Sequence, residues 1–252
     1  MDEIQISEYD FFFSYSRDTY SSIAIELIDV LEAYHLRLWV DKTEVPLGCD
    51  VCKNINNVLN EVQYWKGAIL LLDHSYWKKE WCLKELDIFL QQKTKILPLL
   101  YNQNKSDIPA KYSILKGINV AYLRTSKDIN FAVNKILDQY LKLVKKKEKI
   151  LSINHPILTA LVKDFYYCHT NDFTSLIKIS NIAKCIELCL QKKEYIADNY
   201  DRILFSIIKN KMNGLFAKEH IDRQDFLLSK FALSCLLKRF NVVSDVFNDF
   251  EN

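Results

Sequence analysis

An aromatic residue and a carboxylate lie four positions apart in the run Trp81-Cys82-Leu83-Lys84-Glu85-Leu86. Residues with this spacing share one face of a helix. The apolar run Ala68–Leu72 precedes them, and this order is typical of a buried strand followed by a helix. An indole plane beside a carboxylate suits a flat heterocycle that is held next to a developing positive charge. The run therefore indicates a binding or catalytic site.

Two further segments precede this run along the chain. One is Tyr9-Asp10-Phe11-Phe12-Phe13-Ser14-Tyr15-Ser16, and the other is Asp41-Lys42-Thr43-Glu44-Val45-Pro46-Leu47-Gly48. In this order and spacing the three segments resemble a Toll/interleukin-1 receptor (TIR) domain, and the resemblance covers roughly residues 8–147. It implies an α/β, flavodoxin-like fold with a five-stranded parallel sheet and flanking helices.

Short β-rich runs alternate with helical patterns in the first half of the chain. The expected strands are Tyr9–Tyr15, Leu36–Val40, Ala68–Leu72, Ile96–Tyr101 and Ile118–Leu123. The expected helices are Tyr20–Tyr34, Asp50–Val62, Glu80–Gln92 and Asp128–Lys147. Near-continuous apolar strands in such an alternation favour a parallel sheet covered on both faces. Ligands of such sheets bind at the carboxyl ends of the strands, where the three segments lie.

Residues 148–252 follow another pattern and are expected to form a second, smaller all-α domain after a TIR domain of residues 1–147. This half holds no convincing strand. Pro156 suits a first helical turn, Gly214 a helix end and Asp222 a cap, so we expect four to five helices. Apolar residues recur there at helical spacing, as in Ile179, Ile182, Ile186 and Cys189, and in Ile203 and Ile207.

The composition is that of a globular protein without a strong overall charge. Of its 252 residues 49% are hydrophobic, and 34 Lys and Arg against 32 Asp and Glu give a formal net charge of +2. No global field draws the chain to nucleic acid or anionic lipid. No run reaches the roughly 18 apolar residues of a membrane span, and the N-terminus lacks an apolar signal region. We therefore expect a cytoplasmic protein that binds neither membrane nor nucleic acid.

The seven cysteines are an odd number, are scattered along the chain and read as reduced thiols. Cys49-Asp50-Val51-Cys52 is formally a CxxC motif, but no second pair is placed to complete a zinc site. No metal is expected. No Gly-rich phosphate loop of the GxGxxG or GxxxxGK[ST] type occurs either, so no bound cofactor is expected and any NAD would be a substrate.

The resemblance assigns a catalytic role to Glu85. In the TIR enzymes that this chain resembles, a glutamate at the matching position is essential for cleaving the bond between nicotinamide and ribose in NAD. A carboxylate suits this reaction because it stabilises an oxocarbenium-like centre on the ribose. The residues alone leave an alternative, in which Glu85 is a solvated helix residue paired with Lys78 or Lys84. Non-enzymatic TIR adaptors often lack the glutamate, so its presence favours the enzyme.

The resemblance also implies substrate contacts around Glu85 and at the end of the first strand. The candidates are Trp81, Arg17, Ser16, Phe13, Tyr76 and Ser75. Packing of the helix onto the sheet is the alternative for Trp81, and packing within the sheet is the favoured reading of Phe13. For Arg17 the alternative is a surface pair with Asp18. Cys82 is expected in the core, because the mechanism needs no thiol.

The segment after the second strand matches a mobile loop of the family that gates the pocket and mediates self-association. Its candidate residues are Asp41, Lys42, Glu44, Leu47 and Gly48. A structural role is favoured for Asp41. The chain departs from the family pattern at Asp73 and Lys79, where relatives commonly carry Ser. Ser75 is a candidate to supply the hydroxyl that this Ser would provide.

The leading hypothesis is a TIR NAD hydrolase, that is an NAD+ glycohydrolase (NADase), or an ADP-ribosyl cyclase, in bacterial anti-phage immunity. It would give ADP-ribose or a cyclic or conjugated signalling nucleotide. The implied partners are NAD, other copies through TIR domains, and a downstream effector that senses the product. The alternatives are a non-catalytic TIR adaptor or virulence protein acting by TIR–TIR interaction and, more weakly, a nucleic-acid-responsive enzyme using Lys145–Lys149. That run otherwise reads as a solvated helix end. The helical half is either a folding companion or an assembly module.

Overall fold

The protein is described by a computed structural model that divides into two compact units, Met1–Leu143 and Val144–Asn252. The boundary expected at residue 147 lies outside the described residues. None of the described helices is long and apolar enough to cross a membrane. The structure describes residues 9–19, 23–40, 58–144, 153, 156–167, 173–215 and 223–240.

The first unit is built on a five-stranded sheet in the order β2-β1-β3-β4-β5, and every described pairing is parallel. The expected fold class is confirmed. The strand β4 has its expected bounds, whereas β5 is shorter than expected because its pairing with β4 begins only at Ala121, opposite Leu99. The strands are β1 Phe11–Tyr15, β2 Leu38–Trp39, β3 Gly67–Leu72, β4 Ile96–Tyr101 and β5 Ala121–Leu123.

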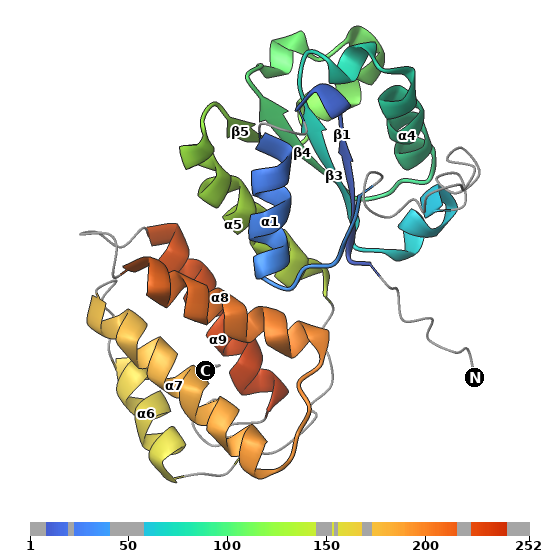
Figure 1. Cartoon of the computed structure of the whole chain (residues 1–252). Coiled ribbons are helices and arrows are strands. Elements are labelled where there is room, and N and C mark those ends of the chain that lie inside the picture. Colours follow the sequence, from blue (N-terminus) through green and yellow to red (C-terminus); the bar gives the residue numbers. More distant parts are fainter. Residues whose placement is uncertain are drawn as a thin grey trace, which may run out of the picture. The chain divides into compact units, whose positions relative to one another are not determined.

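Helices cover both faces of this sheet. Figure 1 shows α1 (Ile25–Ala33) and α5 (Ile129–Leu143) on one face and α4 (Glu80–Gln91) on the other. The helix α4 differs from its expected range by one residue, whereas α5 ends at Leu143 rather than at Lys147. Most of the helix expected at residues 50–62 lies outside the described residues. A 3-10 helix, Ala110–Gly117, occupies part of the connection between β4 and β5 and was not expected.

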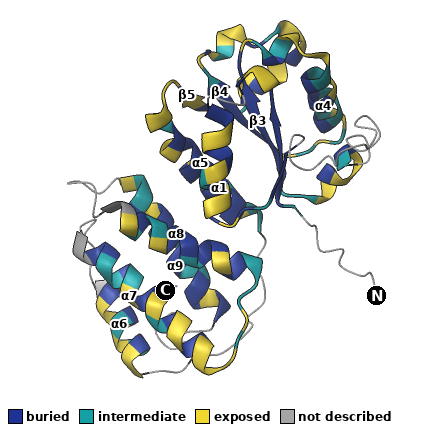
Figure 2. Cartoon of the chain, viewed as in Figure 1, coloured by how far each residue is buried: buried dark blue, intermediate teal, exposed yellow. Residues whose placement is uncertain are grey.

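The core lies on both faces of the central strands, which are buried along their whole length (Figure 2). On the α4 side, Phe12 stacks on Trp39 with ring centroids 4.6 Å apart and meets Phe89 of α4 edge-on at 5.2 Å. On the other side, Phe11 meets Tyr140 of α5 at 6.1 Å. Large rings on alternate sides of β1 hold this strand from both faces. The polar residue that follows them, Ser14, is therefore firmly placed.

The second unit contains four helices within its described residues. The sequence predicts four to five helices in this half. The first begins at Pro156, where the sequence predicts it, and Gly214 lies in the last turn of the third. The predicted cap Asp222 lies outside the described residues. The apolar stripe Ile179, Ile182, Ile186 and Cys189 is buried. The helices are α6 Pro156–Tyr167, α7 Phe173–Lys192, α8 Asn199–Leu215 and α9 Arg223–Arg239.

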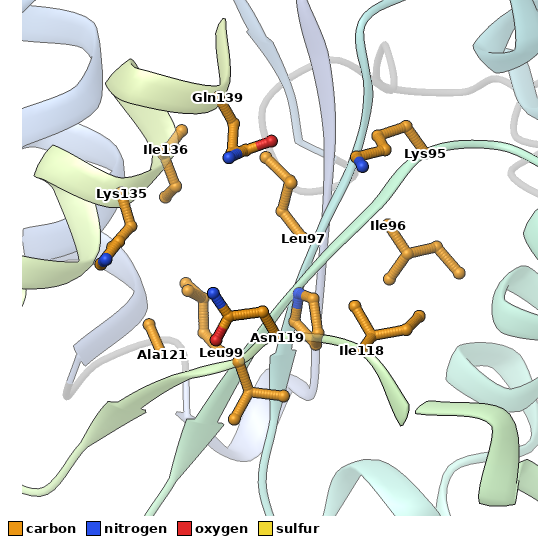
Figure 3. Close-up of a pocket in the computed structure, with 12 residues that line it drawn as sticks. Lys95, Ile96, Leu97, Leu99, Ile118, Asn119, Ala121, Lys135, Ile136 and Gln139 are labelled. Carbon is orange, nitrogen blue, oxygen red and sulfur yellow. The ribbon is translucent and has the colours of Figure 1, made fainter. Parts of the chain in front are cut away.

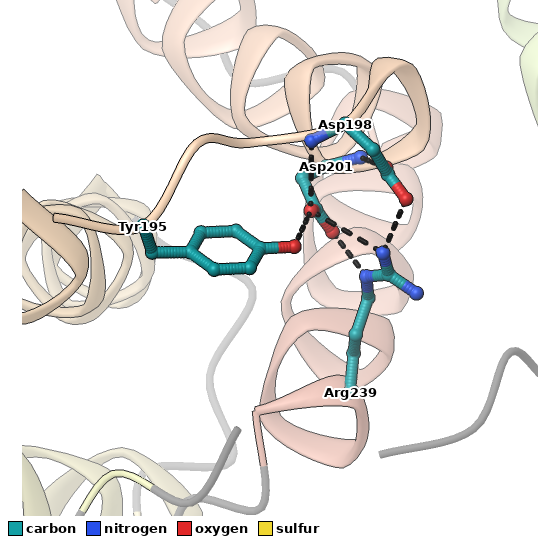
Figure 4. A network of polar contacts seen from close by, with 4 residues as sticks. All are labelled: Tyr195, Asp198, Asp201 and Arg239. Atoms are coloured by element: carbon teal, nitrogen blue, oxygen red, sulfur yellow. Dashed lines mark hydrogen bonds and ion pairs between the residues drawn. The ribbon is translucent and has the colours of Figure 1, made fainter. Parts of the chain in front are cut away.

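A buried polar network joins the end of α9 to the start of α8 (Figure 4). The guanidinium of Arg239 donates to both Asp201 and Asp198. These two aspartates also cap each other's backbone, since Asp201 N donates to Asp198 Oδ1 at 3.0 Å and Asp198 N to Asp201 Oδ2 at 3.2 Å. Tyr195 donates to Asp201 Oδ2 at 2.9 Å, and burial raises the pKa of Tyr195 to about 12, so its hydroxyl stays a donor.

We expect Asp201→Ala to lower the stability of the second unit by about 3 kcal/mol or more, because it leaves the Arg239 guanidinium buried without its main partner. Asp201 is fully buried and Arg239 is 3% exposed. The matched control is Asp164→Ala, which removes an exposed carboxylate paired with the partly buried Lys178 at 2.9 Å and should cost about 1 kcal/mol or less.

The two units can be followed separately, because all tryptophans lie in the first unit, at Trp39, Trp65, Trp77 and Trp81. Urea unfolding followed by tryptophan fluorescence therefore reports on the sheet, whereas far-UV circular dichroism reports on both units. For Asp201→Ala we expect part of the dichroism change to move to lower urea while the fluorescence transition stays in place. Equal behaviour of the Asp201 and Asp164 variants would contradict the role of the network.

Candidate active site

The carboxylate of Glu85 is buried against the first strand. Glu85 is 4% exposed, and Ser14 Oγ, near the carboxyl end of β1, donates to Glu85 Oε2 at 2.5 Å. This burial contradicts the solvated alternative, in which Glu85 pairs with Lys78 or Lys84. The helix α4 packs this face against the sheet because its buried residues recur at helical spacing. They are Cys82, Glu85, Leu86 and Phe89.

A second hydroxyl, that of Tyr76, reaches the same place from the 3-10 turn Tyr76–Lys78. It lies 2.8 Å from Ser14 Oγ and 3.2 Å from the Cys82 carbonyl oxygen, and its one proton can be donated to either of them. The side chain is fully buried. Burial, and after it the charge of Glu85, raises the pKa of Tyr76 well above its usual value, so the phenol stays protonated. Its hydroxyl is engaged inside the protein, and a substrate contact of Tyr76 stays a prediction.

Asp73 organises the turn that carries Tyr76. Its Oδ1 accepts from Tyr76 N at 2.7 Å, and its Oδ2 accepts from Ser75 Oγ at 2.6 Å. An oxygen acceptor three residues before a backbone N–H is the capping geometry that Ser also provides. Asp73 therefore fills the role of a capping residue at a position where the family resemblance led us to expect Ser. The Ser75 hydroxyl points back to this aspartate, and a substrate contact of Ser75 stays a prediction.

Trp81 lies on the same helix as Glu85, one turn earlier. It is partly exposed and packs against the core cluster of the sheet, in line with its structural alternative. Its indole Nε1 is buried and has no hydrogen-bond partner among the described residues. Lys84 Nζ lies over the ring, 4.6 Å from its centroid. The unpaired indole Nε1 is compatible with a ligand contact, and this second role of Trp81 stays a prediction.

The end of β1 contributes residues of different exposure. Ser16 is fully buried, and its Oγ accepts from Asp18 N at 3.3 Å. Arg17 is exposed in the short 3-10 turn Arg17–Thr19. Asp18 pairs with Lys79 at 3.1 Å, so the charge that distinguishes Lys79 from the Ser of relatives forms a surface ion pair.

Phe13 and Cys82 are core residues, as the sequence favoured. Phe13 is 1% exposed and its ring lies 5.9 Å from that of Tyr15. Cys82 is buried, and its thiol donates to the Tyr15 carbonyl at 3.4 Å. The candidate gating residues lie outside the described residues, and their assignment stays a prediction. They are Asp41, Lys42, Glu44, Leu47 and Gly48.

The structure thus brings together Glu85, Tyr76 and Ser14, of which the sequence candidates did not include Ser14. A signal for it exists, because Ser14 interrupts the apolar strand Phe11–Tyr15 and is 1% exposed. A buried hydroxyl in an aromatic strand requires a hydrogen-bond partner. Sequence alone does not say which partner, since Glu85 lies 71 residues further along the chain.

A separate cavity of about 270 Å³ lies at the other end of the sheet (Figure 3). The cavity opens at the start of β4, before the first residue of β4 that pairs with β5. Because the strands are parallel, this end is opposite to the carboxyl ends that carry Ser14. None of the candidate site residues lines the cavity. Its lining includes Lys95, Leu97, Asn119, Lys135, Ile136 and Gln139.

A profile of the TIR domain matches residues 11–137, which is half of the chain. The chain belongs to the TIR domain family. The match runs from the start of β1 into α5 and therefore includes Ser14, Tyr76 and Glu85.

Curated relatives within this family carry names of NAD chemistry. The chain is 29% identical over 134 residues to the NAD(+) hydrolase TcpA of Theionarchaea archaeon, covering 52% of this chain and 39% of the relative. It is 28% identical over 112 residues to the NAD(+) hydrolase TcpC of Escherichia coli, covering 42% and 35%. It is 24% identical over 148 residues to the probable 2' cyclic ADP-D-ribose synthase TcpO of Methanobrevibacter olleyae, covering 58% and 41%. The matches thus span about two fifths of the relatives' lengths.

We expect Asp73→Ala to lower the stability of the TIR domain by about 1–2 kcal/mol, because the turn loses its capping acceptor. Asp73→Ser should retain most of the stability, since a hydroxyl can accept from the same backbone N–H. Urea unfolding followed by tryptophan fluorescence measures both. Loss of equal size in the Ser and Ala variants would show that the carboxylate acts in some way other than capping.

Proposed function

We propose that the chain is an NAD-cleaving TIR enzyme in which Glu85 is the catalytic carboxylate. The observation that carries the proposal is a buried carboxylate, hydrogen-bonded to Ser14, at the carboxyl edge of a parallel sheet. Ligands of open α/β sheets bind at this edge. The names of the relatives, two NAD hydrolases and a probable cyclic ADP-ribose synthase, support the same chemistry.

The reaction needs a negative charge more than it needs an acid. When the bond between the ribose C1′ and the nicotinamide nitrogen breaks, its electron pair stays with nicotinamide, which leaves as a neutral ring. The positive charge then resides on the ribose, where a carboxylate stabilises it. Water adds to C1′ and releases a proton, so NAD and water give nicotinamide, ADP-ribose and a proton.

The nucleophile that captures the ribose decides the product. Water gives ADP-ribose, whereas a hydroxyl or ring nitrogen of the same nucleotide gives a cyclic isomer with loss of a proton. We propose that the reaction serves bacterial anti-phage defence in one of two ways. The product is a signal that a downstream effector senses, or the reaction depletes the cell of NAD. Mass spectrometry of the products formed from NAD distinguishes the two.

A non-catalytic TIR adaptor is the second candidate, and one observation favours it. Glu85 is only 4% exposed and is hydrogen-bonded inside the protein, as expected of a structural carboxylate. An adaptor of this kind would bind other TIR domains and leave NAD intact. Incubation of the purified protein with NAD, followed by assay for nicotinamide, separates this candidate from the enzyme.

We expect Glu85→Gln to reduce NAD cleavage on the order of 100-fold or more, because it removes the charge that stabilises the transition state while it keeps an acceptor for Ser14. Nicotinamide release over time measures the rate. Glu80→Gln is the matched control, since Glu80 is exposed in the first turn of the same helix and should leave the rate unchanged. Activity of Glu85→Gln within about threefold of the unaltered protein would remove Glu85 from catalysis.

We propose further that TIR domains of neighbouring copies complete the active unit and that the helical half controls their proximity. NAD cleavage per molecule should then rise with protein concentration, because association is a second-order process. Nicotinamide release measured over a dilution series, beside light scattering of the same samples, tests this. A constant specific activity across a range in which the scattering mass changes would contradict it.

A further inference from the structure

Three oxygen atoms from three separate elements form a continuous chain beside the catalytic candidate. Tyr76 OH lies 2.8 Å from Ser14 Oγ, and Ser14 Oγ lies 2.5 Å from Glu85 Oε2. The chain begins in the turn after β3, passes through β1 and ends on α4. All three side chains are 4% exposed or less. Water is therefore kept from these bonds, which strengthens them.

The direction of this chain follows from the charge of Glu85. A serine hydroxyl has one proton, and an ionised carboxylate can only accept, so beside ionised Glu85 the Ser14 proton goes to Glu85 Oε2. The contact between Ser14 and Tyr76 then requires the tyrosine to be the donor. The Tyr76 proton is available, because burial and the charge of Glu85 raise the pKa of this phenol well above its usual value. The Cys82 carbonyl oxygen, 3.2 Å from the same hydroxyl, is a second and more distant acceptor for the Tyr76 proton.

Donors that point at a carboxylate favour its ionised form. A buried carboxyl group without such donors tends to take up a proton, because burial penalises the charge. A hydrogen bond to an ionised acceptor is about twice as strong as one between neutral groups, so the loss of Ser14 harms the anion more than the acid. The Tyr76 hydroxyl polarises Ser14 and adds to the effect.

We propose that Ser14 and Tyr76 are positioning residues of this enzyme, forming a hydroxyl relay that holds the Glu85 carboxylate ionised and in a fixed orientation. Neither residue touches the reacting atoms in this assignment, since both act through Glu85. The catalytic consequence of the relay rests on the proposed NAD cleavage. The effect of the relay on the ionisation of the Glu85 carboxylate does not depend on NAD cleavage.

Other titratable groups around the relay leave this assignment intact. Cys82 on α4 and Tyr112 on the 3-10 helix Ala110–Gly117 both act on the Tyr76 pKa, and their effect is smaller than that of burial. Of the charged residues, Lys84 lies over the Trp81 ring and Asp73 accepts from the backbone of Tyr76. Lys79 and Asp18 pair with each other at the surface, and Arg17 is exposed beside them.

The direct test is a titration of the Glu85 carboxyl by 13C NMR in the full chain, with the signal assigned by its loss in Glu85→Gln. Ser14→Ala should move the midpoint of the titration upward by about one to two pH units, because the anion loses a charge-assisted donor. Tyr76→Phe should move it in the same direction by less, since Ser14 still donates. Tyr112→Phe is the matched control, because this buried tyrosine bonds to Lys111 and its hydroxyl has no place in the relay.

The pH profile of NAD cleavage is the second readout. If cleavage requires ionised Glu85, Ser14→Ala should shift the acidic limb of kcat/KM to higher pH by the same amount as the NMR midpoint. Much of the rate should return on the alkaline side. Ser14→Thr restores the hydroxyl and should restore both the midpoint and the limb. A uniform loss of rate at every pH, without a shift of the limb, is the sign of a merely structural role and overturns the relay.

The outcomes separate the relay from the proposed function. Unchanged midpoints in folded Ser14→Ala and Tyr76→Phe proteins overturn the relay, whatever the activity. Shifted midpoints in a protein that releases no nicotinamide at any pH or concentration support the relay and remove the NADase. If Ser14→Ala does not fold, Tyr76→Phe against Tyr112→Phe carries the comparison, because both substitutions keep the ring and remove one hydroxyl.

Discussion

The hydrogen bond between Ser14 and Glu85 depends on nearly every element of the TIR domain. It spans from a central strand to the helix that follows the neighbouring strand, so both must be fixed to within a fraction of an ångström. The strand is held by its pairing with β3, in which Ser14 lies opposite Leu70, and by aromatic rings on both faces. The helix is held by Leu86 and Phe89, which are fully buried beneath it. Apolar packing on both sides thus positions the polar contact between Ser14 and Glu85.

The two units each bury an acid, and they satisfy it in different ways. Asp201 faces the guanidinium of Arg239, which cannot give up its proton, so that network is fixed in its charges. Glu85 faces the hydroxyl of Ser14, which can either donate or accept. A hydroxyl partner therefore remains compatible with a change of hydrogen-bond partner at the carboxylate. The first arrangement suits a structural joint, whereas the second suits a group that takes part in chemistry.

The departures from the family pattern are local and keep the function of the turn. Asp73 accepts from the same type of backbone donor that a Ser would cap, and it takes up the Ser75 hydroxyl as well. Lys79 is matched by Asp18 from the turn after β1, at the surface. Asp73 and Lys79 each lie three residues from Tyr76 in the sequence, and the Tyr76 hydroxyl lies 2.8 Å from Ser14 Oγ. Membership in the family rests on the match of residues 11–137 to the TIR domain profile.

The sequence by itself determined the class of fold, the approximate bounds of β4 and α4, and the identity of Glu85 as the residue of interest. The fold class and these bounds follow from local patterns: a continuous apolar run predicts a buried strand, and four-residue spacing predicts one helix face. The importance of Glu85 follows from the resemblance to the TIR family. It also separated the helical second half, because the change of period is visible in the chain. The observed bounds differ from the expected ones where pairing decides them, as in β5, whose pairing with β4 starts only at Ala121.

Only the tertiary structure decided what surrounds Glu85. A solvated glutamate and a buried one have the same local pattern, and the partner that distinguishes them, Ser14, is 71 residues away. The contact of Tyr76 with Ser14 is hidden for the same reason, since it joins residues 62 positions apart. The Arg239 network likewise joins residues 38 or more positions apart. Hydrogen bonds of this kind depend on distances that only the packing of the whole domain fixes, and a one-dimensional pattern contains no such distances.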